Sequence, residues 1–128
     1  MEESRENRAA RIAVDCAMKV HSALGPGLLE SVYEACMTHE LSKCGIDVQR
    51  QRACPVLYDS IRLDAGFRLD LLVDECLIVE IKAVEELVPL HMAQLLTYLR
   101  LTQHRLGLLM NFNVRRMKDG IQRIANGL

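Results

Sequence analysis

Two charged residues interrupt an otherwise apolar segment near the middle of the chain. Residues 76–84 contain Glu80 and Lys82 and are otherwise wholly apolar, which is the pattern of a strand buried on both faces. Because side chains alternate along a strand, Glu80 and Lys82 should project from the same face, roughly 6–7 Å apart. Unpaired charges in such a place are strongly disfavoured, so the pattern predicts a partner or a ligand for them.

Asp70 interrupts the preceding apolar segment in a similar way. If the two segments form a hairpin, a three-residue connection places Asp70 opposite Glu80. A two-residue connection instead pairs Asp70 with Val79 and turns the carboxylate away from Glu80. The register of this hairpin therefore decides whether the two carboxylates meet.

Two facing carboxylates form a site that Mg²⁺ can occupy, with Mn²⁺ as a substitute, because water and substrate phosphate complete its coordination. Such an ion activates a water molecule for phosphodiester hydrolysis, and Lys82 would add positive charge beside the phosphate oxygens. An internal ion-pair network of Asp70, Glu80 and Lys82 without chemistry explains the same spacing equally well.

The elements that would position these residues follow from the apolar periodicity and the turn signals. They are helices over residues 5–24 and 28–43, strands over 46–58, 61–73 and 76–84, a helix over 89–102, a strand over 106–113 and a closing helix over 115–125. Three consecutive strands imply an antiparallel meander, and the helix before the last strand permits a parallel crossover. We therefore expect one α/β domain over residues 1–128, with a mixed sheet flanked by helices.

The length and the charge of the chain bear on whether it binds nucleic acid. The chain has 128 residues and a formal net charge of −1, which argues against a protein that coats nucleic acid. The C-terminal segment from residue 99 is basic, however, and could meet phosphates as readily as it could form a solvated face.

No apolar run reaches the roughly 20 residues that a membrane span needs. The N-terminus lacks an apolar signal segment and the five cysteines include no CxxC pair, so we expect a cytoplasmic protein.

Two motifs resemble the PD-(D/E)XK nuclease superfamily. Asp70, followed ten residues later by the run Glu80-Ile81-Lys82, is similar to the D…ExK signature of that superfamily. Gln94 and Tyr98 are similar to the QxxxY motif of its RecB-like branch. The resemblance implies the α-β-β-β-α-β core of that superfamily, which agrees with the order of elements given above.

A further match, at residues 27–33, resembles the pattern that names the small bacterial GxxExxY family of that superfamily, with Glu30 and Tyr33 at the named positions. The similarity runs from about residue 21 to the C-terminus. It implies Lys82 as the catalytic lysine, Gln94 and Tyr98 as residues that support the site or contact substrate, and these metal ligands: Glu30, Asp70, Glu80 and the main-chain carbonyl of Ile81.

Three of these residues also have simpler interpretations. Glu30 lies in the first turn of the second predicted helix, where a carboxylate favours the helix dipole without any metal. Gln94 and Tyr98 are four residues apart on one helix face and could form a hydrogen-bonded pair.

Two functions are compatible with the sequence. The first is a Mg²⁺-dependent nuclease with nucleic acid as its partner. The second is a catalytically idle nuclease-fold protein that binds or scaffolds a partner, which the near-neutral charge and the absence of tryptophan favour. A homodimer, or a protein partner that supplies specificity, is compatible with either function.

Overall fold

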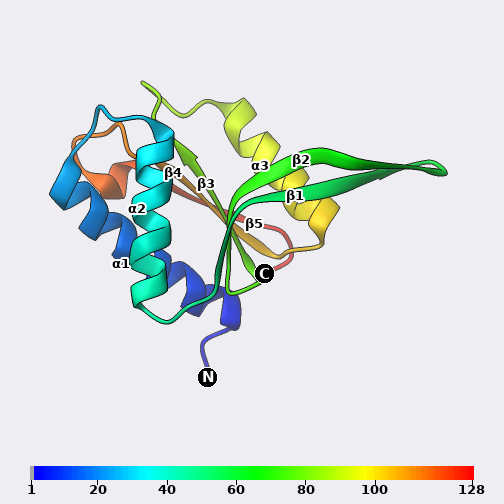
Figure 1. The fold of residues 1–128 in the computed structure, drawn as a ribbon, viewed down its shortest axis with the longest axis horizontal. Helices are drawn as coiled ribbons and strands as arrows, with labels where there is room; N and C mark the ends of the chain where they lie inside the picture. Colours follow the sequence, from blue (N-terminus) through cyan, green and yellow to red (C-terminus); the bar gives the residue numbers. More distant parts are fainter. Residues whose placement is uncertain (1) are drawn as a thin grey trace.

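Three α-helices, five strands and a short 3₁₀ helix form the part of the chain that the structure describes, residues 2–128. The structure is a computed structural model, drawn as a ribbon in Figure 1. In chain order the elements are α1 (Arg5–Leu24), α2 (Glu30–Lys43), β1 (Val48–Tyr58), β2 (Ile61–Val73), β3 (Leu77–Lys82), α3 (Pro89–Thr102), β4 (Leu106–Asn111), η1 (Met117–Gly120) and β5 (Ile121–Ala125).

The helix ends follow from local chemistry. The Ser4 hydroxyl accepts a hydrogen bond from the Asn7 N–H (3.0 Å) and so caps the start of α1, and Gly25 ends that helix with a left-handed φ of 68°. Pro89 begins α3, where its missing N–H is not needed. Among the described residues no helix is long and apolar enough to cross a membrane.

The strands described by the structure form one mixed sheet in the order β1-β2-β3-β4-β5. β1 with β2 and β2 with β3 are antiparallel, and β3 pairs with β4 in parallel through the crossover helix α3. β5 then pairs antiparallel with β4. The predicted α/β fold, a meander followed by a crossover, is therefore confirmed.

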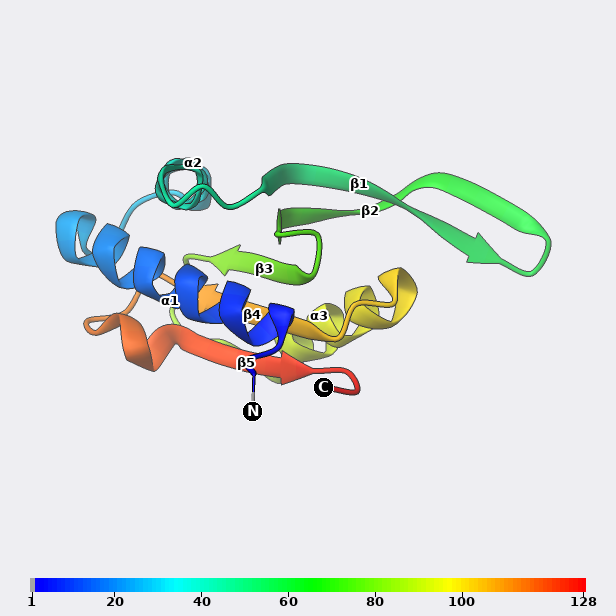
Figure 2. The ribbon, with the colours of Figure 1, turned by 90° about the horizontal axis from the view of Figure 1, so that it is seen from below.

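Helices cover both faces of the sheet, as Figures 1 and 2 show. The larger apolar cluster joins α1 and α2 to residues such as Val79 and Ile81 of β3, and the smaller one joins α3 to Ile78 and Leu109. Alternation along β3 then places Glu80 and Lys82 on the same face as Ile78, which is the α3 face.

The outer halves of β1 and β2 form an arm (residues 54–67) that projects from the rest of the protein (Figure 2). Its apolar side chains are largely exposed: Leu57 and Tyr58 are each 70 % exposed and Ile61 is 54 % exposed. A cavity of about 460 Å³ is lined by Leu57 together with Leu72 of β2 and Leu101 of α3. Within the arm only Cys54, at its base, is buried.

The predicted closing helix over residues 115–125 is wrong. The structure has the short helix η1 followed by β5, which pairs with β4 from Met110 opposite Ile121 to Leu106 opposite Ala125. Gly120 allows the close approach, because an added Cβ would overlap the main-chain oxygen of Asn111. The hydrogen-bonding edge of β4 therefore determined the conformation of this segment more strongly than its apolar spacing.

Candidate active site

Asp70 and Glu80 meet where β2 and β3 stop pairing. The two strands are in register from Val73 opposite Leu77 to Leu71 opposite Val79, and the ladder ends there. This is the register of a three-residue connection, so the carboxylates of Asp70 and Glu80 face each other.

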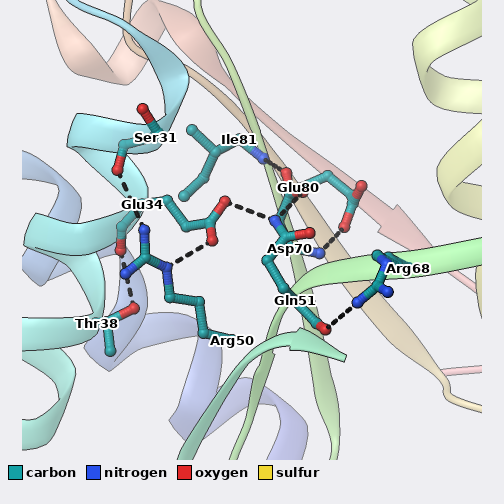
Figure 3. Close-up of polar contacts among 9 residues, drawn as sticks. All are labelled: Ser31, Glu34, Thr38, Arg50, Gln51, Arg68, Asp70, Glu80 and Ile81. Atoms are coloured by element: carbon teal, nitrogen blue, oxygen red, sulfur yellow. Dashed lines mark hydrogen bonds and ion pairs between the residues drawn. The ribbon is translucent and has the colours of Figure 1, made fainter. Parts of the chain in front are cut away.

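Each of the two carboxylates accepts a main-chain N–H of the opposite strand (Figure 3). Glu80 Oε2 accepts from the Asp70 N–H (2.8 Å), and Asp70 Oδ2 accepts from the Ile81 N–H (2.8 Å). The two side chains thus bind the main chain where the β2–β3 ladder ends. Their orientation is fixed by the backbone of the two strands.

Burial and nearby negative charge both disfavour the charged forms of this pair. Glu80 is 4 % exposed, and its pKa is raised to about 8, first by burial and then by the negative charge of Asp70. Burial also raises the pKa of Asp70, although the hydrogen bond from the Ile81 N–H opposes that shift. The positive charge of Lys82 lowers both pKa values, which places it within electrostatic range of both carboxylates.

α2 contributes a carboxylate at each of two positions. Glu30 Oε2 accepts from the Ala83 N–H (3.0 Å), just beyond β3, so this side chain lies beside the end of the strand that carries Glu80 and Lys82. Glu34, one turn later, is 6 % exposed and binds Arg50 of β1, with Arg50 Nε 2.7 Å from Glu34 Oε1.

Gln51 connects Glu34 to Asp70, as Figure 3 shows. Its side-chain nitrogen lies 2.9 Å from Glu34 Oε2 and 3.3 Å from Asp70 Oδ1. Sequence analysis missed both Glu34 and Gln51. Glu34 lies on a helix face with apolar neighbours, and its burial shows only once β1 has been placed against α2.

The remaining predicted residues lie on the α3 side. The aromatic ring of Tyr98 stacks on Phe67 with centroids 4.5 Å apart, and burial followed by the charges of Glu80 and Asp70 raises the pKa of Tyr98. Gln94 is exposed one turn earlier on α3. Lys82 is half-buried, and its side chain forms no hydrogen bond or ion pair with residues 2–128, so its ammonium group is available to a ligand.

The donors present suit a hard cation. Asp70 and Glu80 provide carboxylate oxygens, and Glu80 uses only one of its two oxygens in hydrogen bonds within the described part of the chain. The negative charge of Glu34 also raises the pKa of both residues, so a bound cation would offset an excess of negative charge. No group of three or more His, Cys, Asp or Glu residues among 2–128 is arranged to hold a metal ion. Two carboxylates suffice for Mg²⁺, which retains water and takes substrate oxygens as further ligands.

The comparisons with known proteins agree with this arrangement. A family model of the PD-(D/E)XK nuclease superfamily matches residues 7–124, nearly the whole chain. No curated protein and no solved structure gives a significant match. The paired carboxylates at the split between β2 and β3, the lysine two residues after Glu80 and the match over residues 7–124 together show that this chain belongs to the PD-(D/E)XK nuclease superfamily.

Proposed function

We propose that the chain is a Mg²⁺-dependent nuclease of the GxxExxY type that hydrolyses phosphodiester bonds of nucleic acid. The observation that carries the proposal is the Asp70–Glu80 pair, in which Glu80 is buried and Asp70 is half-buried. Reciprocal main-chain hydrogen bonds fix the pair, and the ammonium group of Lys82 is free beside it. A cytoplasmic location, where both Mg²⁺ and nucleic acid are present, belongs to the same proposal.

The metal would be held by oxygen atoms of Asp70 and Glu80, with the carbonyl of Ile81 and the carboxylate of Glu30 as further ligands. When bound, it would supply a water of lowered pKa and a positive charge for the phosphate. Lys82 would stabilise the negative charge that develops on the phosphate oxygens as water attacks phosphorus and the ester oxygen leaves. Gln94 and Tyr98 would approach the substrate from α3, where the charges of Glu80 and Asp70 already act on Tyr98.

The test is a cleavage assay with labelled single- and double-stranded DNA and RNA in Mg²⁺ or Mn²⁺. We expect Glu80→Gln and Lys82→Ala each to lower the cleavage rate about a hundredfold or more, because the first removes a metal ligand and the second removes the positive charge beside the reacting phosphate. Glu75→Gln and Lys118→Ala are the matched controls, since both residues are exposed and lie outside the site. Circular dichroism and thermal denaturation verify that each variant is folded.

Retained cleavage by the purified, folded Glu80→Gln and Lys82→Ala variants would contradict the assigned roles. A wild-type protein that neither binds Mn²⁺ nor cleaves any of the four substrates would favour the scaffold function instead.

A further inference from the structure

Gln51 has an unusual backbone conformation for a residue inside a strand. Its φ is 51°, in the left-handed region that non-glycine residues seldom adopt. β1 and β2 remain in register on both sides, with Arg50 opposite Leu71 and Arg52 opposite Leu69, but the pair of Gln51 with Asp70 is missing from the ladder. Strain of this kind persists only where the surrounding contacts impose it.

The hydrogen bonds of Arg50 and Gln51 explain the strained backbone conformation of Gln51. In a regular strand, residues 50 and 51 would point to opposite faces. Here Arg50 and Gln51 donate to the same Glu34 carboxylate, at 2.7 Å to Oε1 and 2.9 Å to Oε2. The left-handed turn of the backbone at Gln51 thus brings its amide to Glu34, and from there the same nitrogen reaches Asp70 Oδ1 at 3.3 Å.

We propose that Gln51 is a positioning residue, whose amide, anchored by Glu34 of α2, fixes the orientation of the Asp70 carboxylate. Asp70 then has a donor on each oxygen, the Ile81 N–H on Oδ2 and the Gln51 amide on Oδ1, so rotation about its last side-chain bond is restricted. In this way α2 is coupled to the carboxylate pair through one side chain of β1. The part of the inference that concerns metal affinity rests on the proposed function; the contact itself does not.

The first test uses the metal-free protein and a double-mutant cycle in urea. Gln51→Met keeps the bulk of the side chain and removes its donor. We expect its equilibrium constant of unfolding to be higher than that of the wild type. In the Asp70→Ala background the same substitution should have an effect smaller by about threefold, because its partner is already absent. Equal effects in the two backgrounds would overturn the proposal, whether or not the protein binds metal.

The second test separates positioning from simple stabilisation, by calorimetric titration with Mn²⁺. Glycine adopts a positive φ without strain, so Gln51→Gly should destabilise the metal-free protein less than Gln51→Met does. Both variants should nevertheless weaken Mn²⁺ binding by about tenfold, the usual loss when a residue that orients a metal ligand is removed.

The matched control is Gln49→Met, the same substitution two residues earlier on β1, at a side chain that contacts Arg52 instead of the site. It should leave the Mn²⁺ affinity unchanged. Wild-type affinity in both Gln51 variants would overturn the positioning role. Failure of the wild type itself to bind Mn²⁺ would count against the proposed function, while the double-mutant cycle would still decide the role of Gln51.

Discussion

At the scale of single residues, the site depends on how the buried carboxylate of Glu80 and the half-buried carboxylate of Asp70 are tolerated. Asp70 and Glu80 lie where the β2–β3 ladder ends, and each carboxylate accepts a main-chain N–H of the opposite strand. The hydrogen bonds offset part of the loss of hydration. The part of this loss that the hydrogen bonds do not offset raises the pKa of both residues. Binding of a proton or a cation would neutralise the charge that causes it.

The raised pKa of Glu80 predicts how stability depends on pH. In the unfolded chain this carboxyl group ionises near its ordinary value of 4.5, whereas in the folded protein its pKa is about 8. Between these values the folded protein holds a proton that the unfolded chain has released. The contribution to stability is therefore complete below the ordinary value and is lost as pH rises through about 8.

Urea unfolding of the metal-free protein from pH 5 to 8.5 measures this dependence. We expect the free energy of unfolding of the wild type to fall with rising pH relative to that of Glu80→Gln. The control variant Glu75→Gln, in the β2–β3 connection, should follow the wild type. Parallel curves for wild type and Glu80→Gln would contradict the prediction.

Sequence reasoning identified part of this residue-level arrangement. The odd-length connection after Val73 determined the pairing of Asp70 with Glu80, because alternation along a strand leaves only two choices. The hydrogen bonds that link Glu34 to Asp70 through Gln51 could not be predicted from the sequence. It depends on a left-handed residue within a strand and on the docking of α2 against β1, and neither leaves a pattern in the order of residues.

At the scale of secondary-structure elements, β5 shows how tertiary pairing overrides local spacing. Met117, Ile121 and Ile124 recur at intervals that suit one face of a helix. In the fold, the open edge of β4 offers hydrogen-bonding groups along its whole length, and β5 pairs with them over five residues. By contrast, the helices predicted over about residues 5–24 and 89–102 agree with the structure, since Gly25 ends the first and Pro89 begins the second.

This arrangement predicts a large effect of Gly120→Ala. The added methyl group would overlap the Asn111 carbonyl oxygen, which is main chain and cannot move aside cheaply. We expect a loss of about 3 kcal/mol in the free energy of unfolding, measured in urea. Gly45→Ala is the control, because Gly45 has open space around it and only a positive φ of 73°, which costs an alanine about 1 kcal/mol. Equal losses in the two variants would refute the close approach of β5 to β4.

At the scale of the whole molecule, the arm is separate from the layers that contain the site. The carboxylates lie near its base, whereas the exposed residues Leu57, Tyr58 and Ile61 lie toward its tip. The buried clusters that stabilise the fold include Cys54 at the base of the arm and Leu69 just beyond it, but none of its tip. Stability and metal binding should therefore not depend on the tip.

Replacing residues 57–62 by an Asn-Gly turn tests this independence. Val56 and Leu63 are already opposite each other, so a two-residue turn can close the shortened hairpin. We expect the free energy of unfolding to change by about 0.5 kcal/mol or less and the Mn²⁺ affinity to stay the same. Leu69→Ala, at a buried position near the base, should instead cost about 2–5 kcal/mol. A large loss on shortening would show that the tip contributes to the folded core.

The side-chain acceptors at the end of the β2–β3 ladder have a consequence for hydrogen exchange. Amide hydrogens inside a ladder exchange with solvent only when strands separate, but those of Asp70 and Ile81 are bonded to side-chain carboxylates, whose hydrogen bonds change when a proton or a cation binds. Their exchange rates thus follow the state of the Asp70 and Glu80 side chains, while Leu71 and Val79 next to them report on the strands alone. Two neighbouring pairs of amides in one sheet therefore distinguish a change at the site from a loosening of the fold.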